Sequence, residues 1–68
     1  MALRKCTKNE ALAAAKKYGC EDEHDFKSHV IGNFQSISYY DIFIESSTRE
    51  IFIGDKNGKN LQPTGVEL

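Results

Sequence analysis

His24 and Lys27 stand three residues apart in the segment HDFK, and this pair is well suited to chemistry on a phosphate group. On a helix, side chains at this spacing share a face. An imidazole titrates near neutral pH and acts as a general acid or base, while a neighbouring ammonium attracts phosphate. The structural alternative is a surface histidine at the start of a helix and a lysine that pairs with the nearby acidic residues.

Asp41 lies in the segment YYDIFIE, in the middle of an otherwise apolar strand pattern. Aspartate is disfavoured inside strands. Either its face of the sheet is open to water, or its carboxylate accepts hydrogen bonds from a fixed partner such as His24, a tyrosine hydroxyl or Arg49. Asp41 is therefore a third candidate for a functional site.

Aromatic and basic residues provide candidate contacts for a substrate. Tyr39, Phe43 and Phe52 are predicted to lie on one face of the sheet, where they would stack on RNA bases or cover the contact with a partner protein. Candidate phosphate contacts near the C-terminus are Lys56, Lys59 and Thr64. The plain alternative for the Pro-Thr-Gly segment is a strand ending.

Other kinds of site lack their patterns. The segment GDKNGK does not have the spacing of a phosphate loop, and His24 and His29 are five apart, which does not align two metal ligands on one helical face. Cys6 and Cys20 flank a predicted helix that would hold their Cα atoms about 18 Å apart. A disulfide requires less than about 7 Å. We therefore expect two free thiols and no metal site.

The first element that must position these residues is a helix over residues 8–18. Thr7 and Glu10 have the spacing of a capping box, in which each side chain accepts from the other residue's backbone N–H. The segment EALAAAKKY has high helix propensity, and Gly19 suits the left-handed position that follows a helix.

A second, shorter helix is predicted over residues 22–31 and would carry His24 and Lys27. Asp22 can cap it, the acidic residues of its first turn suit the helix dipole, and Gly32 ends it. The alternative is that Val30 and Ile31 begin a strand.

The remainder of the chain has the apolar period of a sheet. It predicts three antiparallel strands, over residues 36–45, 50–55 and 59–66. The isoleucines face the helices, Asn57-Gly58 predicts a two-residue hairpin turn, and Pro63 belongs at a sheet edge or a bulge. The expected fold class is α+β, with one or two N-terminal helices packed on a three-stranded antiparallel β-meander.

Size and composition indicate one small globular domain. The chain has 68 residues, of which 40% are hydrophobic and 28% charged, and a net charge of −1. No apolar run approaches the roughly 20 residues of a membrane span, and the N-terminus lacks the apolar core of a signal peptide. We expect a cytoplasmic protein as the chain stands, or a secreted or delivered one if it is a fragment of a larger protein, with no membrane partner.

Four segments, in this order, resemble the C-terminal toxin modules of bacterial polymorphic toxin systems. In those modules an H-x-x-K helix precedes a Y-D-I-Y strand, a hairpin and a terminal P-T-G. The matching segments here are HDFK at 24–27, YDIFI at 40–44, EIFI at 50–53 and PTG at 63–65. The resemblance covers roughly residues 10–66.

The resemblance implies a small metal-independent ribonuclease whose helices precede an antiparallel sheet that holds RNA. In it, His24 would be the acid or base, Lys27 and Thr64 would contact phosphate, and Asp41 would support them. The RNA 2′-hydroxyl would attack its own phosphate, so the enzyme need only move protons and stabilise charge. The resemblance implies no cofactor and, as a partner, a cognate immunity protein.

Two other functions remain open at this point. The chain would be a non-catalytic binding module if its aromatic sheet face held a protein partner or single-stranded RNA, or a small structural protein of unrelated role. Convergence of the four candidate catalytic side chains in one cleft would favour the enzyme. Their dispersal beside an uninterrupted aromatic face would favour binding.

Overall fold

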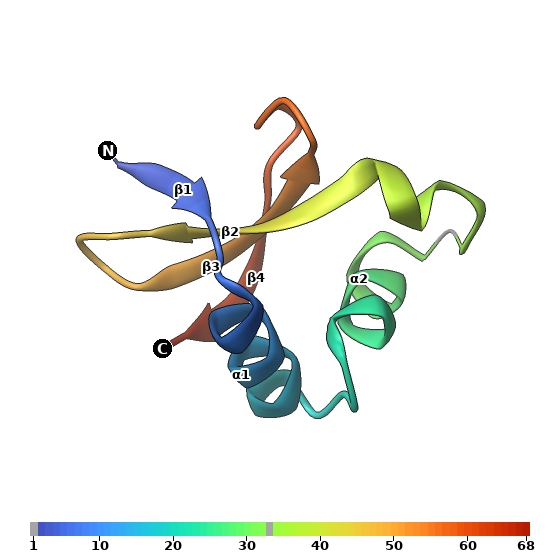
Figure 1. The fold of residues 1–68 in the computed structure, drawn as a ribbon, viewed down its shortest axis with the longest axis horizontal. Helices are drawn as coiled ribbons and strands as arrows, with labels where there is room; N and C mark the ends of the chain where they lie inside the picture. The colour runs from blue at the N-terminus through green and yellow to red at the C-terminus, as the bar shows by residue number, and fades with distance from the viewer. Residues whose placement is uncertain (1, 33) are drawn as a thin grey trace.

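The computed structural model describes residues 2–32 and 34–68 as two helices packed on one antiparallel sheet (Figure 1). The α+β class is confirmed. The sheet has four strands in the order β1-β2-β3-β4. The elements in chain order are β1 (Leu3–Lys5), α1 (Lys8–Tyr18), α2 (Glu23–Ile31), the 3-10 helix η1 (Phe34–Tyr39), β2 (Tyr40–Glu45), β3 (Glu50–Asp55) and β4 (Gln62–Glu67).

Helix α1 has the predicted bounds, because local signals specify both of its ends. The Glu10 N–H donates to Thr7 Oγ1 at 3.2 Å, and the Thr7 N–H donates to Glu10 Oε1 at 2.9 Å, which completes the capping box. At the other end Gly19 is left-handed, with φ of 101°.

Helix α2 is also present and begins one residue later than predicted. Asp22 precedes the helix as its cap, and its Oδ1 accepts from the Asp25 N–H at 2.8 Å. The alternative that Val30 starts a strand is wrong, because the helix continues to Ile31.

The core lies between the helices and one face of the sheet. Ile42, Ile44, Ile51 and Ile53 supply the sheet side, as the alternation predicted. The helices supply Ala11, Ala14, Ala15 and Phe26. The small alanines let α1 approach the sheet closely, while the Phe26 ring fills the space under α2. This apolar layer fixes how the two helices stand over the sheet.

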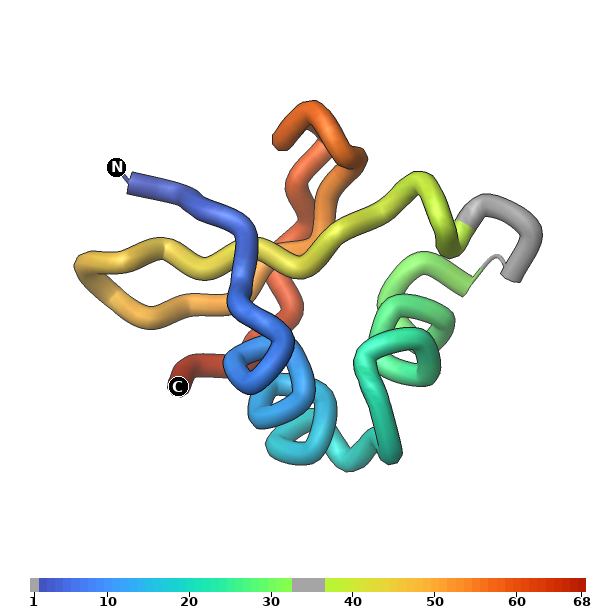
Figure 2. Tube along the Cα trace, viewed as in Figure 1, coloured from blue at the N-terminus to red at the C-terminus, as the bar shows by residue number. Residues whose placement is uncertain are grey.

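The prediction of three strands was wrong, because β1 adds a fourth at the edge of β2. Leu3, Arg4 and Lys5 pair antiparallel with residues 43–45. Three residues are too few to show a strand period, so β1 gave no sequence signal. The chain therefore leaves the sheet after β1, forms both helices, and returns to it as β2 (Figure 2).

The predicted first strand started too early. Residues 36–39 belong to η1, and β2 begins at Tyr40. Ile37 is buried, with 2% of its surface exposed. A short apolar pattern does not distinguish a strand from a helical turn that buries the same side chain. Tyr39 consequently lies outside the sheet face on which it was predicted.

The turn between β3 and β4 is longer than predicted, because it spans residues 56–61 and β4 begins at Gln62 rather than residue 59. The Asp55 carboxylate organises it: Oδ1 accepts from the N–H groups of Asn57 and Lys59, both at 2.9 Å. These bonds, the one from Lys59 above all, lower the pKa of Asp55. Gly58 has a positive φ but Asn57 does not, so the two-residue turn was wrong.

Among the described residues, no helix is long and apolar enough to cross a membrane.

Candidate functional site

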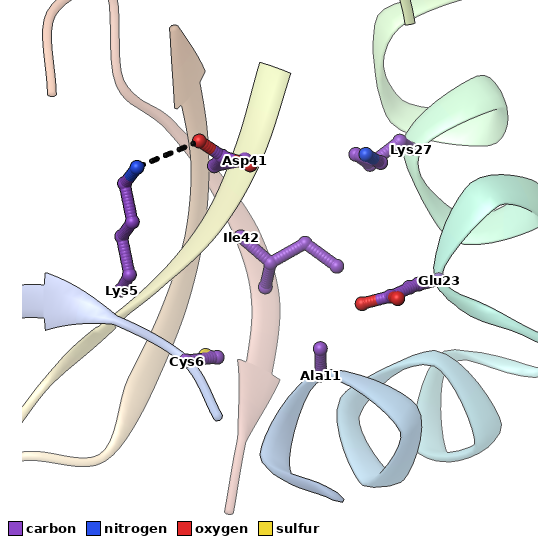
Figure 3. A pocket seen from close by; sticks show the side chains of 7 residues that line it. All are labelled: Lys5, Cys6, Ala11, Glu23, Lys27, Asp41 and Ile42. Atoms are coloured by element: carbon purple, nitrogen blue, oxygen red, sulfur yellow. Dashed lines mark ion pairs between the residues drawn. The ribbon is translucent and has the colours of Figure 1, made fainter. Parts of the chain in front are cut away.

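A polar pocket of about 150 Å³ opens where the edge of β2 meets the two helices (Figure 3). It lies at the end of β1, where that short strand stops covering β2. The side chains around it come from β1, α1, α2 and β2, and from the residue that follows β1. They are Lys5, Cys6, Ala11, Glu23, Lys27, Asp41 and Ile42. Two of them, Lys27 and Asp41, were candidate catalytic residues from the sequence.

Lys27 enters the pocket from α2 and is half-buried there. Its Nζ donates to the main-chain carbonyl of Tyr40 at 3.1 Å, which places the ammonium at the first residue of β2. Glu23 lies one helical turn earlier on the same side of α2 and also lines the pocket. The helix thus presents one cation and one carboxylate to the same space.

Asp41 stands on the opposite side of the pocket, on β2. Its Oδ2 forms an ion pair with Lys5 Nζ at 3.2 Å, and the two side chains are 31% and 58% exposed. Its cross-strand neighbour on β3 is Gly54, so no bulky side chain stands against it there. A mid-strand aspartate is tolerated here because its carboxylate is partly exposed to water and pairs with a lysine from a strand that the sequence did not reveal.

Cys6, Ala11 and Ile42 form the less polar part of the lining. Burial, with a smaller effect from the Glu10 charge, raises the pKa of the Cys6 thiol to about 11. A nucleophilic cysteine requires a lowered pKa. Cys6 therefore contributes a neutral wall to the pocket.

His24 is exposed on α2, and its side chain does not line the pocket. It follows Glu23 directly, and consecutive helical residues diverge by about 100°. The pocket lining thus includes Lys27 and Asp41 but not His24, although the i,i+3 spacing places His24 on the Lys27 side of the helix.

Thr64 is also outside the pocket. It lies on β4, the edge strand opposite β1. Its hydroxyl donates to the Ile51 carbonyl at 2.7 Å and accepts from the Val66 N–H at 3.2 Å. The pairing register of β3 and β4 shifts in this region, between Glu50 and Phe52. The hydroxyl holds the irregular edge strand in place.

The three aromatic candidates differ in exposure. Phe43 and Phe52 are cross-strand partners on the sheet face away from the helices, but Phe43 is only 6% exposed. Tyr39 is 68% exposed and belongs to η1. Its carbonyl accepts from the Lys56 N–H at 3.1 Å, so Tyr39 and Lys56 lie together beside the start of β2. Lys59 is exposed further along the same turn.

Sequence reasoning missed Lys5 and Glu23 as members of this site. Glu23 had a usable signal, because it precedes Lys27 by four residues on a predicted helix. Lys5 had none, because its position follows from the undetected strand β1.

A second group of side chains with metal-binding chemistry lies at the junction of α1 and α2. Cys20, Asp25 and His29 each place a ligand atom within 4.8 Å of the others. The spacing of His24 and His29 does not predict a metal site, whereas the structure brings His29 to a cysteine and an aspartate. The available signal was the i,i+4 spacing of Asp25 and His29 on one helix.

Comparisons with models of protein families, with curated proteins and with solved structures found no significant match to this chain. The function of the pocket is therefore inferred from its own chemistry.

Proposed function

We propose that this chain is a toxin-like ribonuclease domain that cleaves RNA by acid–base catalysis without a metal ion, with the pocket as its active site. The observation that carries the proposal is that Lys27 and Asp41 line one pocket. They lie on a helix and a strand, and the sequence pattern predicts a functional role for each of them independently. The resemblance to toxin modules supplies the reaction class.

Two ammonium groups suit the pocket to a phosphodiester. Lys27 reaches it from α2 and Lys5 from β1 (Figure 3). Cations held in place stabilise the negative charge that develops on phosphoryl oxygens during attack. Both lysines already have oxygen partners, the Tyr40 carbonyl and the Asp41 carboxylate. Their ammonium groups are thereby oriented before a substrate arrives.

Two carboxylates can move the proton that the reaction requires. The 2′-hydroxyl of RNA must lose a proton as it attacks the adjacent phosphate, and the leaving 5′-oxygen must gain one. Glu23 and Asp41 face the pocket from its two sides, so either can accept the first proton. Lys27 is the candidate donor for the second. The proposal gives His24 no step inside the pocket, because its side chain does not line it.

The neighbouring surface extends the site toward a polymeric substrate. Tyr39 and Lys56 lie beside Tyr40, whose carbonyl receives Lys27. An exposed ring stacks on a base irrespective of its sequence, and a lysine contacts the adjoining phosphate. The proposed direction of an RNA strand is therefore from the pocket across the start of β2 toward Tyr39.

The test is cleavage of a mixed transfer-RNA pool with EDTA present. Discrete cuts are expected, and Asp41→Asn and Lys27→Met should each reduce the cleavage rate by about 100-fold or more. Lys16→Met is the matched control, because Lys16 is exposed on α1 away from the pocket. Circular dichroism of each variant in the same EDTA buffer checks that it is folded.

Three outcomes would contradict parts of the proposal. Folded wild-type protein that cuts no more than Asp41→Asn is not this ribonuclease, and retention of RNA in a gel-shift assay would then favour the binding module. Cuts that persist in Asp41→Asn but vanish in His24→Ala would assign proton transfer to the histidine. If Lys16→Met reduced the cleavage rate as much as Lys27→Met, the loss would reflect the net charge of the protein rather than the pocket.

A further inference from the structure

We propose that Cys20, Asp25 and His29 form a zinc site at the junction of α1 and α2, separate from the pocket and beyond the proposed ribonuclease function. Cys20 follows α1, and the other two residues lie one turn apart on α2. The three offer sulfur, oxygen and nitrogen, a ligand set that zinc accepts.

Two of the three distances between the ligand atoms match those in a tetrahedral site, and the third, from Cys20 Sγ to the Asp25 carboxylate, is within 4.8 Å. Cys20 Sγ lies 3.7 Å from His29 Nδ1, and His29 Nδ1 lies 3.5 Å from Asp25 Oδ1. With zinc bonds of about 2.3 Å to sulfur and about 2.1 Å to nitrogen and oxygen, a tetrahedron separates sulfur from nitrogen by about 3.6 Å and nitrogen from oxygen by about 3.4 Å. Binding therefore needs only small side-chain movements.

The surroundings orient the ligands. The Glu21 N–H donates to Asp25 Oδ2 at 3.3 Å, which turns Oδ1 toward the histidine. Outer hydrogen bonds of this kind are typical of metal sites. His29 Nδ1 also lies 3.1 Å from the Asp25 main-chain carbonyl, so the imidazole ring must turn away from this oxygen and hold its proton on Nε2 when Nδ1 binds zinc. The Cys20 thiol proton would leave to solvent on binding.

The competing interpretation is that Cys20 is a catalytic nucleophile. The electrostatic surroundings of the thiol argue against that role. Burial, followed by the Asp25 carboxylate, raises the pKa of the Cys20 thiol. A nucleophilic thiol needs the opposite. A dication between sulfur and carboxylate removes their mutual repulsion. The His29 and Asp25 side chains are 60% and 42% exposed, which leaves room for water as the fourth ligand.

The site and the pocket lie on different sides of α2. Glu23 and Lys27 face the pocket, and Asp25 and His29 are each two residues further along the helix, which is about 200° around its axis. The zinc would tie the end of α1 to the middle of α2. Its role is therefore to stabilise the helix pair rather than to act on a substrate.

The test measures binding of Zn²⁺ by titration calorimetry and of Co²⁺ by the absorption of a thiolate-ligated tetrahedral ion. One ion per chain is expected. Cys20→Ser and His29→Asn should each weaken zinc binding by more than about tenfold. Cys6→Ser and His24→Asn are matched controls, because they remove a cysteine and a histidine that are not zinc ligands. Both variants should retain zinc binding.

A second readout is thermal. Zinc at about a hundredfold excess over its Kd should raise the Tm of wild-type protein by roughly 10–20 °C, and EDTA should reverse the rise. Exposed His29 makes His29→Asn the variant least at risk of unfolding, and its Tm should not respond. The proposal is overturned if wild-type protein binds no stoichiometric zinc, or if Cys6→Ser or His24→Asn loses binding as fully as Cys20→Ser. None of these outcomes depends on RNA cleavage.

Discussion

The two faces of the sheet differ in what they carry at equivalent positions. On the inner face the cross-strand pairs are Ile42 with Ile53 and Ile44 with Ile51, and all four are nearly fully buried under the helices. On the outer face the pairs are Asp41 with Gly54 and Phe43 with Phe52. Strand alternation produces both sets from the same two segments.

This difference separates stability from chemistry. The inner face buries one kind of side chain in one continuous layer with α1 and α2. In the described part of the chain no helix covers the outer face (Figure 1), and Asp41 pairs there with Lys5. The pocket opens at the β2 edge, where the two faces meet. Substitutions on the inner face should therefore unfold the protein, whereas those of Asp41 and Lys5 should mainly change its activity.

The largest effect is expected for Ile53→Ala. Ile53 is fully buried, so the change removes apolar contacts and leaves a cavity, at a cost of about 2–5 kcal/mol in the free energy of unfolding. For a domain of this size that is most of its stability. Urea denaturation measures it. A loss below about 1 kcal/mol would mean that the inner face collapses around the gap.

A smaller effect is expected for Gly54→Ala on the outer face. A Cβ at this position would lie 2.6 Å from Leu61 Cδ2 and 3.0 Å from the Lys59 carbonyl oxygen. The crowding should cost about 1–3 kcal/mol in thermal or urea unfolding. Leu61→Ala in the same chain should recover only part of this, because the backbone carbonyl remains. Full recovery would locate the clash in the leucine alone.

The Lys5–Asp41 pair should contribute less still. Both side chains are substantially exposed, so a double-mutant cycle of Lys5→Met and Asp41→Asn should give a coupling energy below about 1 kcal/mol. The same variants should nevertheless lose RNA cleavage. A large coupling energy together with unchanged RNA cleavage would mean that this outer-face pair contributes to stability rather than to activity.

The smallest effect concerns Glu10, which ties α1 to β1 through Arg4 at 2.7 Å. The Arg4 guanidinium, followed by the Thr7 N–H, lowers the pKa of Glu10 to about 2. Because the unfolded value is near 4.3, its contribution is complete above that pH and disappears as pH falls toward 2. The stability difference between wild type and Glu10→Gln should shrink across this window in denaturation measured at several pH values. A difference independent of pH would contradict it.

Elements whose signals are local could be predicted from the amino-acid sequence. The bounds of α1 follow from Thr7, Glu10 and Gly19, which act within one turn of each helix end. The inner face follows from a period of two sustained over β2 and β3. The turn after β3 was predicted wrongly. Asn57-Gly58 predicts a two-residue turn, but the Asp55 carboxylate accepts hydrogen bonds from the backbone of a longer one.

Which candidate side chains meet depends on how the helices and strands pack together. Lys27 and Asp41 share a pocket because α2 packs over the β2 edge, whereas Thr64 is held by the backbone of β3. Lys5 joins them through a strand of three residues, too short for any periodic signal. Cys20 meets His29 because the chain reverses between the helices. Spacing along the chain specifies neighbours within one helix or strand, but contacts between elements depend on how the apolar layer packs.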